Sequence, residues 1–85
     1  MKITWTRTAL KGLKRLPAHQ RSQVIETMEA LAADPFAPDN NIKPLKGLTD
    51  AYRRRFGDLR VSYTLDRDAQ TLTVYEVAPR GKAYR

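Results

Sequence analysis

The chain has 85 residues and no cysteine, and its net charge of +7 comes from 16 Lys and Arg against 9 Asp and Glu. This length predicts a single domain over residues 1–85, and the absence of cysteine excludes disulfides and thiolate metal sites. A surface this basic indicates a polyanionic partner, either nucleic acid or an acidic protein. No stretch is apolar enough to cross a membrane, and residues 1–10 lack the apolar centre of a signal peptide, so we expect a cytoplasmic protein.

The N-terminal half predicts one strand followed by two helices. Residues 1–6 alternate weakly, with Ile3 and Trp5 on one face, and either Thr6 or Thr8 can cap a helix over about residues 7–16. Pro17 separates this helix from a second helix that runs to about residue 33. The second helix carries an apolar stripe, which predicts an antiparallel helical hairpin packed on a sheet: Val24, Ile25, Met28, Leu31 and Ala32.

The C-terminal half predicts antiparallel strands joined by turns. Residues 34–44 contain three prolines and are expected to form a loop, and residues 45–47 an extended segment. Strands are predicted over 51–56 and 60–65, around a tight turn at Gly57-Asp58, and over 71–77, before a basic tail at 80–85. The predicted class is therefore α+β: an N-terminal strand, a two-helix antiparallel hairpin, and then an antiparallel sheet of three or four strands.

The predicted hairpin AYRRRFGDLRVSY, residues 51–63, carries the most informative charge pattern. Successive side chains of a strand point to opposite faces, so Arg53 and Arg55 share one face and Arg54 takes the other. Arg60, on the next strand, is expected beside Arg53 and Arg55. Three guanidiniums this close repel one another, and a polyanion between them would relieve the repulsion, so the pattern indicates a phosphate-binding surface.

The remaining titratable residues favour one reaction. His19 has no partner at metal-ligand spacing, Asp66 and Asp68 flank a turn, and the four glycines are scattered, so we expect no metal and no cofactor. Arginine stabilises charge that grows in a transition state, and neighbouring cations favour a tyrosinate. Five residues could together promote attack of an RNA 2′-hydroxyl on its adjacent phosphate: Arg53, Arg55, Arg60, Arg80 and Tyr84. Simple nucleic-acid binding would need the same arginines but no Tyr84.

Five segments of the sequence, taken in order, are informative about its family: ITWTRTALKGLKRLP, LAADP, LKG, AYRRRFGDLRVSY and VAPRGKAYR. No single one is specific, but their order and spacing resemble the RelE/ParE superfamily of bacterial type II toxins over essentially the whole chain. The resemblance implies an endoribonuclease of the RelE branch, which cleaves mRNA in the ribosomal A site, inhibits translation and is neutralised by a cognate antitoxin. We expect a monomeric toxin that forms hetero-oligomers with the antitoxin and does not associate with membranes.

The resemblance also implies roles for individual residues. Arg53 and Arg55 occupy two central-strand positions that can be lysine, and Arg60 matches the phosphate-binding arginine of the next strand. Arg80 matches the arginine assigned to the transition state and the leaving group, and Tyr84 matches the tyrosine proposed as general base. Beyond these matched positions, four more basic residues are expected to bind RNA: Lys46, Arg54, Lys82 and Arg85.

Departures from the family pattern leave other functions open. Arginine at positions 53 and 55 gives up the easier proton transfer of lysine, and Ala78-Pro79 stands where a glycine and a basic residue are common. One alternative is a DNA gyrase inhibitor of the ParE branch, whose members share the scaffold but generally lack the full arginine and tyrosine set. Another is an inactive relative that only binds its antitoxin. The combination of Arg60, Arg80 and Tyr84 favours the RelE branch.

Overall fold

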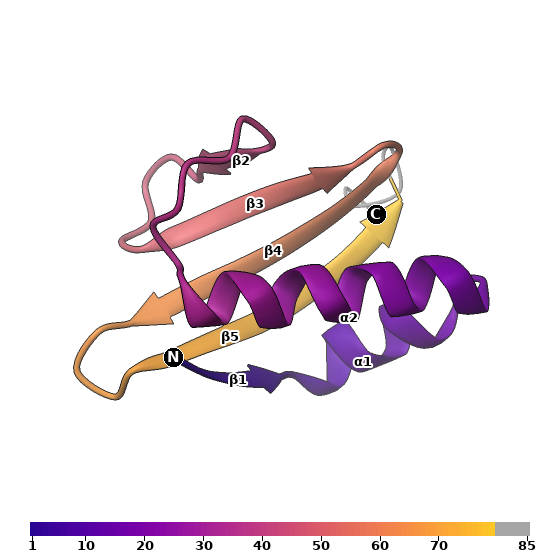
Figure 1. Ribbon diagram of the computed structural model, residues 1–85, viewed down its shortest axis with the longest axis horizontal. Helices are drawn as coiled ribbons and strands as arrows, with labels where there is room; N and C mark the ends of the chain where they lie inside the picture. Colours follow the sequence, from indigo (N-terminus) through magenta and orange to yellow (C-terminus); the bar gives the residue numbers. More distant parts are fainter. Residues whose placement is uncertain (80–85) are drawn as a thin grey trace.

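A five-stranded sheet, in the order β1-β5-β4-β3-β2, forms the framework of this computed structural model, which describes residues 1–79 (Figure 1). Strands β2 to β5 pair antiparallel, and β1 joins β5 in parallel. The predicted α+β class is confirmed, with four antiparallel strands after the helical hairpin. The elements are β1 Lys2–Trp5, α1 Arg7–Lys14, α2 Ala18–Ala33, β2 Ile42–Pro44, β3 Ala51–Phe56, β4 Leu59–Asp66 and β5 Thr71–Pro79.

Local signals set the bounds of the two helices. The Thr6 hydroxyl accepts a hydrogen bond of 3.1 Å from the backbone N–H of Ala9, so the predicted cap of α1 is confirmed. α1 ends before residue 16, the predicted end, because the N–H groups of Arg15 and Leu16 bond to carbonyls three residues back and tighten the last turn. Pro17 then stands at the N-cap of α2 and separates the two helices as predicted.

The segment predicted to be a loop over residues 34–44 ends in a strand. Residues 42–44 pair with β3 at the edge of the sheet. The following residues, predicted to be extended, form a turn instead: the Leu48 N–H bonds to the Leu45 carbonyl, and Gly47 has a φ of +80°. Periodicity cannot reveal a three-residue strand that ends in Pro44, whose missing N–H is tolerated only at an edge.

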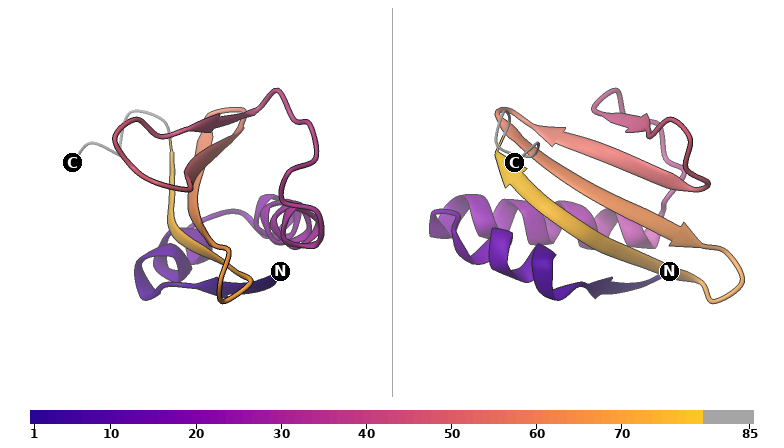
Figure 2. Two further views of the ribbon diagram at one scale, coloured as in Figure 1. Left: turned by 90° about the vertical axis from the view of Figure 1, so that its left-hand side faces the viewer. Right: turned by 180° about the vertical axis from the view of Figure 1, so that it is seen from behind.

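One hydrophobic cluster joins the helices to the sheet, with buried residues from α1, α2, β3, β4 and β5. Figure 2 shows α2 lying along one face of the sheet, and α1 packs against β5. Neither helix within residues 1–79 combines the length and apolar character that crossing a membrane requires. The face of β3 that turns away from the cluster carries Arg53 and Arg55, because Tyr52, Arg54 and Phe56 alternate with them.

Candidate nucleic-acid interface

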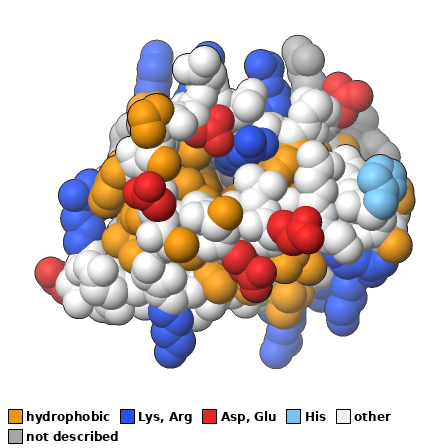
Figure 3. Space-filling model, in the orientation of Figure 1, with side chains coloured by type: hydrophobic (Ala, Val, Ile, Leu, Met, Phe, Trp, Pro, Cys, Tyr) orange, Lys and Arg blue, Asp and Glu red, His pale blue; other side chains and the backbone are white. Residues whose placement is uncertain are grey.

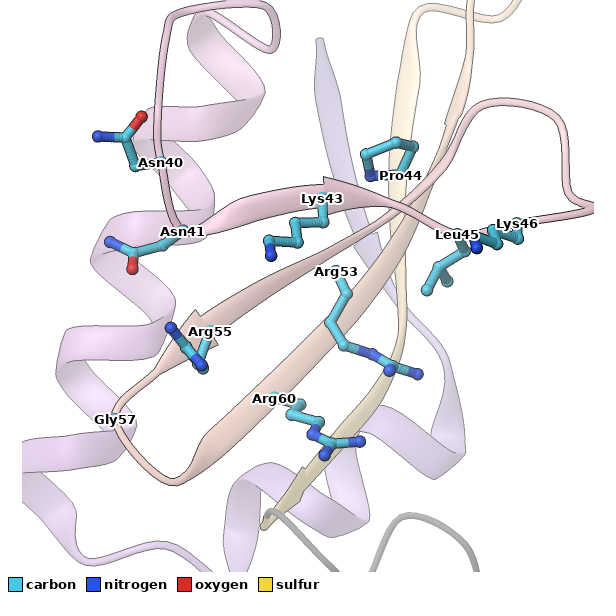
Figure 4. A pocket seen from close by; sticks show the side chains of 10 residues that line it. All are labelled: Asn40, Asn41, Lys43, Pro44, Leu45, Lys46, Arg53, Arg55, Gly57 and Arg60. Atoms are coloured by element: carbon cyan, nitrogen blue, oxygen red, sulfur yellow. The ribbon is translucent and has the colours of Figure 1, made fainter.

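A pocket of about 420 Å³ lies on this second face of the sheet (Figure 4). Its wall comes from residues 40–46, β3, the turn after β3, and β4. We call it the basic pocket, because five of its lining residues are cations and none is acidic: Lys43, Lys46, Arg53, Arg55 and Arg60. The other lining residues are Asn40, Asn41, Pro44, Leu45 and Gly57. Its size falls in the range of roughly 300–1,000 Å³ typical of ligand pockets.

The three arginines that the sequence grouped together meet at this pocket. Arg55 lies directly opposite Arg60 in the β3–β4 register, and Arg53 lies two residues before Arg55 on the same face of β3. Figure 4 shows the side chains of Arg53 and Arg60 pointing the same way. Like charges directly opposite one another repel, and an anionic group between Arg55 and Arg60 would reduce that repulsion, so the basic pocket is suited to phosphate.

Two lysines extend the pocket beyond the arginines. Lys46, expected to bind RNA, lines it from the turn after β2. Lys43 also lines it, although the sequence did not single this residue out. In β2 it lies directly opposite Arg53. Recognising β2 as a strand would have revealed Lys43, because its register then places it beside a known arginine.

Arg54 was expected to bind RNA, but the structure places it away from the basic pocket. Its Nε donates a hydrogen bond of 3.2 Å to Asp39 Oδ2, and its guanidinium carbon lies 4.3 Å from the centroid of the Phe56 ring. The backbone N–H of Asn41 and the charge of Arg54 lower the pKa of Asp39. Arg54 therefore holds the loop that leads into β2, and through Asn41 it supports one wall of the pocket.

The basic stretches of the sequence do not all form one patch. Residues 1–16 hold five basic and no acidic residues, yet none of them lines the basic pocket. Figure 3 shows acidic side chains among hydrophobic ones on the face that carries α2, with Lys and Arg projecting at its edges. The basic tail, residues 80–85, contains four of the predicted site residues, all outside the described part of the chain: Arg80, Lys82, Tyr84 and Arg85.

The position of Tyr63 excludes it as a proton acceptor at the basic pocket. It is buried in the hydrophobic cluster, and its ring centroid lies 5.7 Å from that of Tyr52. Burial raises the pKa of Tyr63 to about 12, and electrostatic interactions with Tyr52 and Asp39 add to the effect. Tyr63 is therefore neutral near pH 7 and points away from the basic pocket.

Alkaline titration tests this environment. The pKa of Tyr63 rises from about 10 in the unfolded chain to about 12, so its contribution to stability is complete below about pH 10 and is lost as the pH rises through 12. When tyrosinate absorbance is followed, Tyr63→Phe is expected to remove the ionisation step near pH 12. A last step near pH 12 that survives in Tyr63→Phe would assign the shift to another tyrosine.

Two comparisons with known protein sequences both find toxins. The family described as the ParE toxin of type II toxin–antitoxin systems, parDE, matches residues 3–84. A curated protein of Methanocaldococcus jannaschii, named as a toxin, RelE1, is 34% identical over 77 residues, which cover 89% of this chain and 86% of that protein.

Solved structures give the same result at the level of the fold. A chain of the archaeal RelE–RelB complex from Pyrococcus horikoshii OT3 is similar with a TM-score of 0.80 and 25% identity, over 95% of this chain and 96% of that chain. A chain of the toxin–antitoxin complex RelBE2 from Mycobacterium tuberculosis is similar with a TM-score of 0.75 and 27% identity, over 93% and 96% of the two chains. The family carries the ParE name, whereas these relatives carry RelE names.

Proposed function

The chain belongs to the RelE/ParE superfamily of type II toxin–antitoxin toxins, and from this premise we propose that it is a ribosome-dependent mRNA endonuclease. The observation that supports the proposal is the basic pocket. Five of its lining side chains are Lys or Arg, and none is Asp or Glu. RNA carries one negative charge per nucleotide, and Arg donates paired hydrogen bonds to phosphate oxygens. The pocket therefore matches a scissile phosphate in charge and in hydrogen-bonding capacity.

The proposed reaction uses a nucleophile that the substrate already contains. The RNA 2′-oxygen bonds to the adjacent phosphorus while the bond from phosphorus to the 5′-oxygen breaks. Arg53, Arg55 and Arg60 hold the phosphate, Tyr84 takes the proton of the 2′-hydroxyl, and Arg80 stabilises the phosphorane-like charge and the leaving oxygen, which then takes a proton from water. The products are a 2′,3′-cyclic phosphate and a 5′-hydroxyl end. DNA cannot react in this way, because it has no 2′-hydroxyl.

The ribosome is part of the proposal because arginine is a poor proton donor. Its guanidinium stays protonated near pH 7, so the three arginines of the pocket can neutralise charge but cannot readily move protons. In-line geometry must then supply much of the rate, and a ribosome that fixes the mRNA can impose it. We also propose a cytoplasmic location and an antitoxin partner whose acidic segment covers the basic pocket. Charge reversal at Arg53, Arg55 and Arg60 together would then weaken the toxin–antitoxin complex in a calorimetric titration.

A second candidate is inhibition of DNA gyrase. The ParE name of the matching family favours it, and a basic pocket would also suit DNA or an acidic surface of an enzyme. This activity needs no proton acceptor in the pocket. It predicts intact mRNA and impaired supercoiling, so the two candidates give opposite results in two simple assays.

The decisive experiment maps mRNA cuts in a purified translation system by primer extension, with and without ribosomes. Wild-type protein is expected to cut only with ribosomes and to leave 5′-hydroxyl ends, and both Arg80→Ala and Tyr84→Phe are expected to weaken the cuts. Rapid cutting of naked RNA at the same sites would contradict the dependence on ribosomes. Intact mRNA with well-folded wild type would reject the endonuclease, and a gyrase supercoiling assay would then test the second candidate.

A further inference from the structure

A row of four side chains crosses the sheet beside the basic pocket. Lys43 on β2 lies opposite Arg53 on β3, Arg53 lies opposite Ser62 on β4, and Ser62 lies opposite Glu76 on β5. Lys43 and Arg53 line the basic pocket, whereas Ser62 and Glu76 do not. The row therefore connects two pocket cations to a carboxylate two strands away from Arg53.

Hydrogen bonds run along this row. Arg53 Nε donates to Ser62 Oγ at 3.3 Å, and the Ser62 hydroxyl donates to Glu76 Oε1 at 3.1 Å. Arg53 Nη2 also lies 3.9 Å from Glu76 Oε1, so each of Arg53, Ser62 and Glu76 contacts the other two. Ser62 is completely buried, and about a third of the Arg53 side chain is exposed. Arg53 is thus held from its inner side by a buried hydroxyl and a carboxylate.

An irregularity in β5 places Glu76 in this row. Ser62 pairs with Glu76 but the next residue, Tyr63, pairs with Val74, so Tyr75 has no partner on β4. In a regular strand, Glu76 would share the buried face of Val74, two residues earlier. The extra residue turns Glu76 to the arginine face instead. Bulges of this kind are frequent next to active sites, where they re-aim a side chain.

Arg55 provides the contrast within the same strand and on the same face. Its side chain makes no hydrogen bond or ion pair with any of residues 1–79, and it lies opposite Arg60. Arg53 and Arg55 therefore differ in how firmly they are held, although both line the basic pocket. Holding Arg53 in this way weakens the attraction of the pocket for RNA, because the negative charge of the Glu76 carboxylate repels a polyanion.

We propose that Ser62 and Glu76 are positioning residues that hold the guanidinium of Arg53 in place over the basic pocket. The consequence for cleavage rests on the proposed function, whereas the ordering of Arg53 does not. A guanidinium that is already oriented loses less rotamer freedom when it meets a phosphate, and it presents its donors in a defined direction. Glu76 lowers the affinity of the pocket for RNA and in return fixes the geometry of one donor.

Two substitutions separate orientation from charge. Ser62→Ala removes the acceptor of Arg53 Nε without changing charge, and it is expected to slow cleavage about tenfold, since misplacement by about 1 Å can cost up to 10²-fold. Glu76→Gln keeps an oxygen acceptor for Ser62 but removes the negative charge. It is expected to bind a 2′-O-methyl RNA, which cannot be cut, several-fold more tightly and yet to cleave mRNA more slowly. Tighter binding with slower cleavage is a result that a merely structural role of Glu76 would not produce.

Thr73→Val is the matched control. Thr73 lies on β5, the strand that carries Glu76, and its hydroxyl shares a 2.9 Å hydrogen bond with the Thr4 hydroxyl. Thr73 does not line the basic pocket. This variant also loses a side-chain hydrogen bond between neighbouring strands, one that joins two hydroxyls and no charged group, and it should retain wild-type cleavage and RNA binding. Cleavage slowed equally in Thr73→Val and Ser62→Ala would overturn the proposal, because general destabilisation would explain both.

NMR relaxation of the arginine Nε–H groups reads the ordering of Arg53 directly, with Arg55 as reference in the same spectrum. Arg53 is expected to be more ordered than Arg55 in the wild type and to approach Arg55 in Ser62→Ala. Unchanged order at Arg53 in both Ser62→Ala and Glu76→Gln would overturn the proposal. If wild-type protein cuts no mRNA, the proposed function fails, but the relaxation data and RNA binding still decide the role of Ser62 and Glu76.

Discussion

Replacement of Arg60 by alanine is expected to lower ribosome-dependent mRNA cleavage by roughly 10²–10³-fold, the usual effect of deleting one donor that stabilises transition-state charge. Arg60 lies directly opposite Arg55 and lines the basic pocket. Its planar guanidinium can donate two parallel hydrogen bonds to a phosphate, which a lysine cannot do. Arg60→Lys is therefore expected to recover only part of the rate. The measurement is the rate of cutting at one mapped site in single-turnover conditions.

Arg67→Ala supplies the matched control for lost positive charge. Arg67 lies in the turn between β4 and β5, and its Nε is 3.0 Å from Asp50 Oδ2. Arg67 Nη2 also donates to Asp50 Oδ1 at 3.0 Å, but the pair is at the surface, with 57% of the Arg67 side chain exposed, so its removal should leave the fold intact. Wild-type cleavage by Arg67→Ala is expected. Equal losses in Arg67→Ala and Arg60→Ala would attribute the effect to net charge, and full activity of Arg60→Ala would remove Arg60 from the site.

Gly12→Ala is expected to cost the protein about 3 kcal/mol of unfolding free energy, at the upper end of overpacking effects. Gly12 lies in α1, and a Cβ atom there would stand 2.0 Å from the backbone oxygen of Val77. Because that contact is with backbone on β5, no side chain can rotate away, and α1 must move off the strand. The loss is a large part of the roughly 5–12 kcal/mol expected for a chain of this length. Urea unfolding followed by far-UV circular dichroism measures it.

Helix propensity alone predicts the opposite sign for this substitution. Alanine is favoured over glycine in a helix by about 1 kcal/mol, so an uncrowded position would gain stability. Gly57→Ala provides a comparison, because Gly57 has a φ of +59° and open space around it, so only backbone strain of about 1 kcal/mol opposes alanine. We expect Gly12→Ala to be the more destabilising of the two. A stabilised Gly12→Ala would mean that α1 does not pack closely on β5.

Features that depend on neighbouring residues were predictable from the sequence. The Thr6 cap and Pro17 set helix bounds, and the glycine of the Gly57-Asp58 turn supplies the positive φ that a two-residue hairpin turn requires. Strict alternation in β3 then placed Arg53 and Arg55 on one face. These predictions succeeded because capping, turn geometry and alternation act over a few residues and do not depend on the rest of the fold.

Arg54 shows where the same reasoning was incomplete. Alternation correctly separated it from its neighbours, yet its charge alone suggested RNA binding. Its contacts with Asp39 and Phe56 involve residues that are not adjacent to it in the chain, and only the packed loop brings Asp39 within reach. The charge of a side chain is a property of the sequence, but whether that charge is available to a ligand depends on its partners in the fold.

The sequence by itself determined the class of fold, the helical hairpin and the group of arginines on one strand face. Only the tertiary structure decided that Lys43 lines the basic pocket and that Glu76 contacts Arg53. Both depend on pairing between strands distant in the chain: β2 exists because β3 supplies its hydrogen bonds, and the bulge in β5 reverses the face that alternation assigns to Glu76. Alternation is local, whereas register is settled by which pairing buries the core, and that requires the whole sheet.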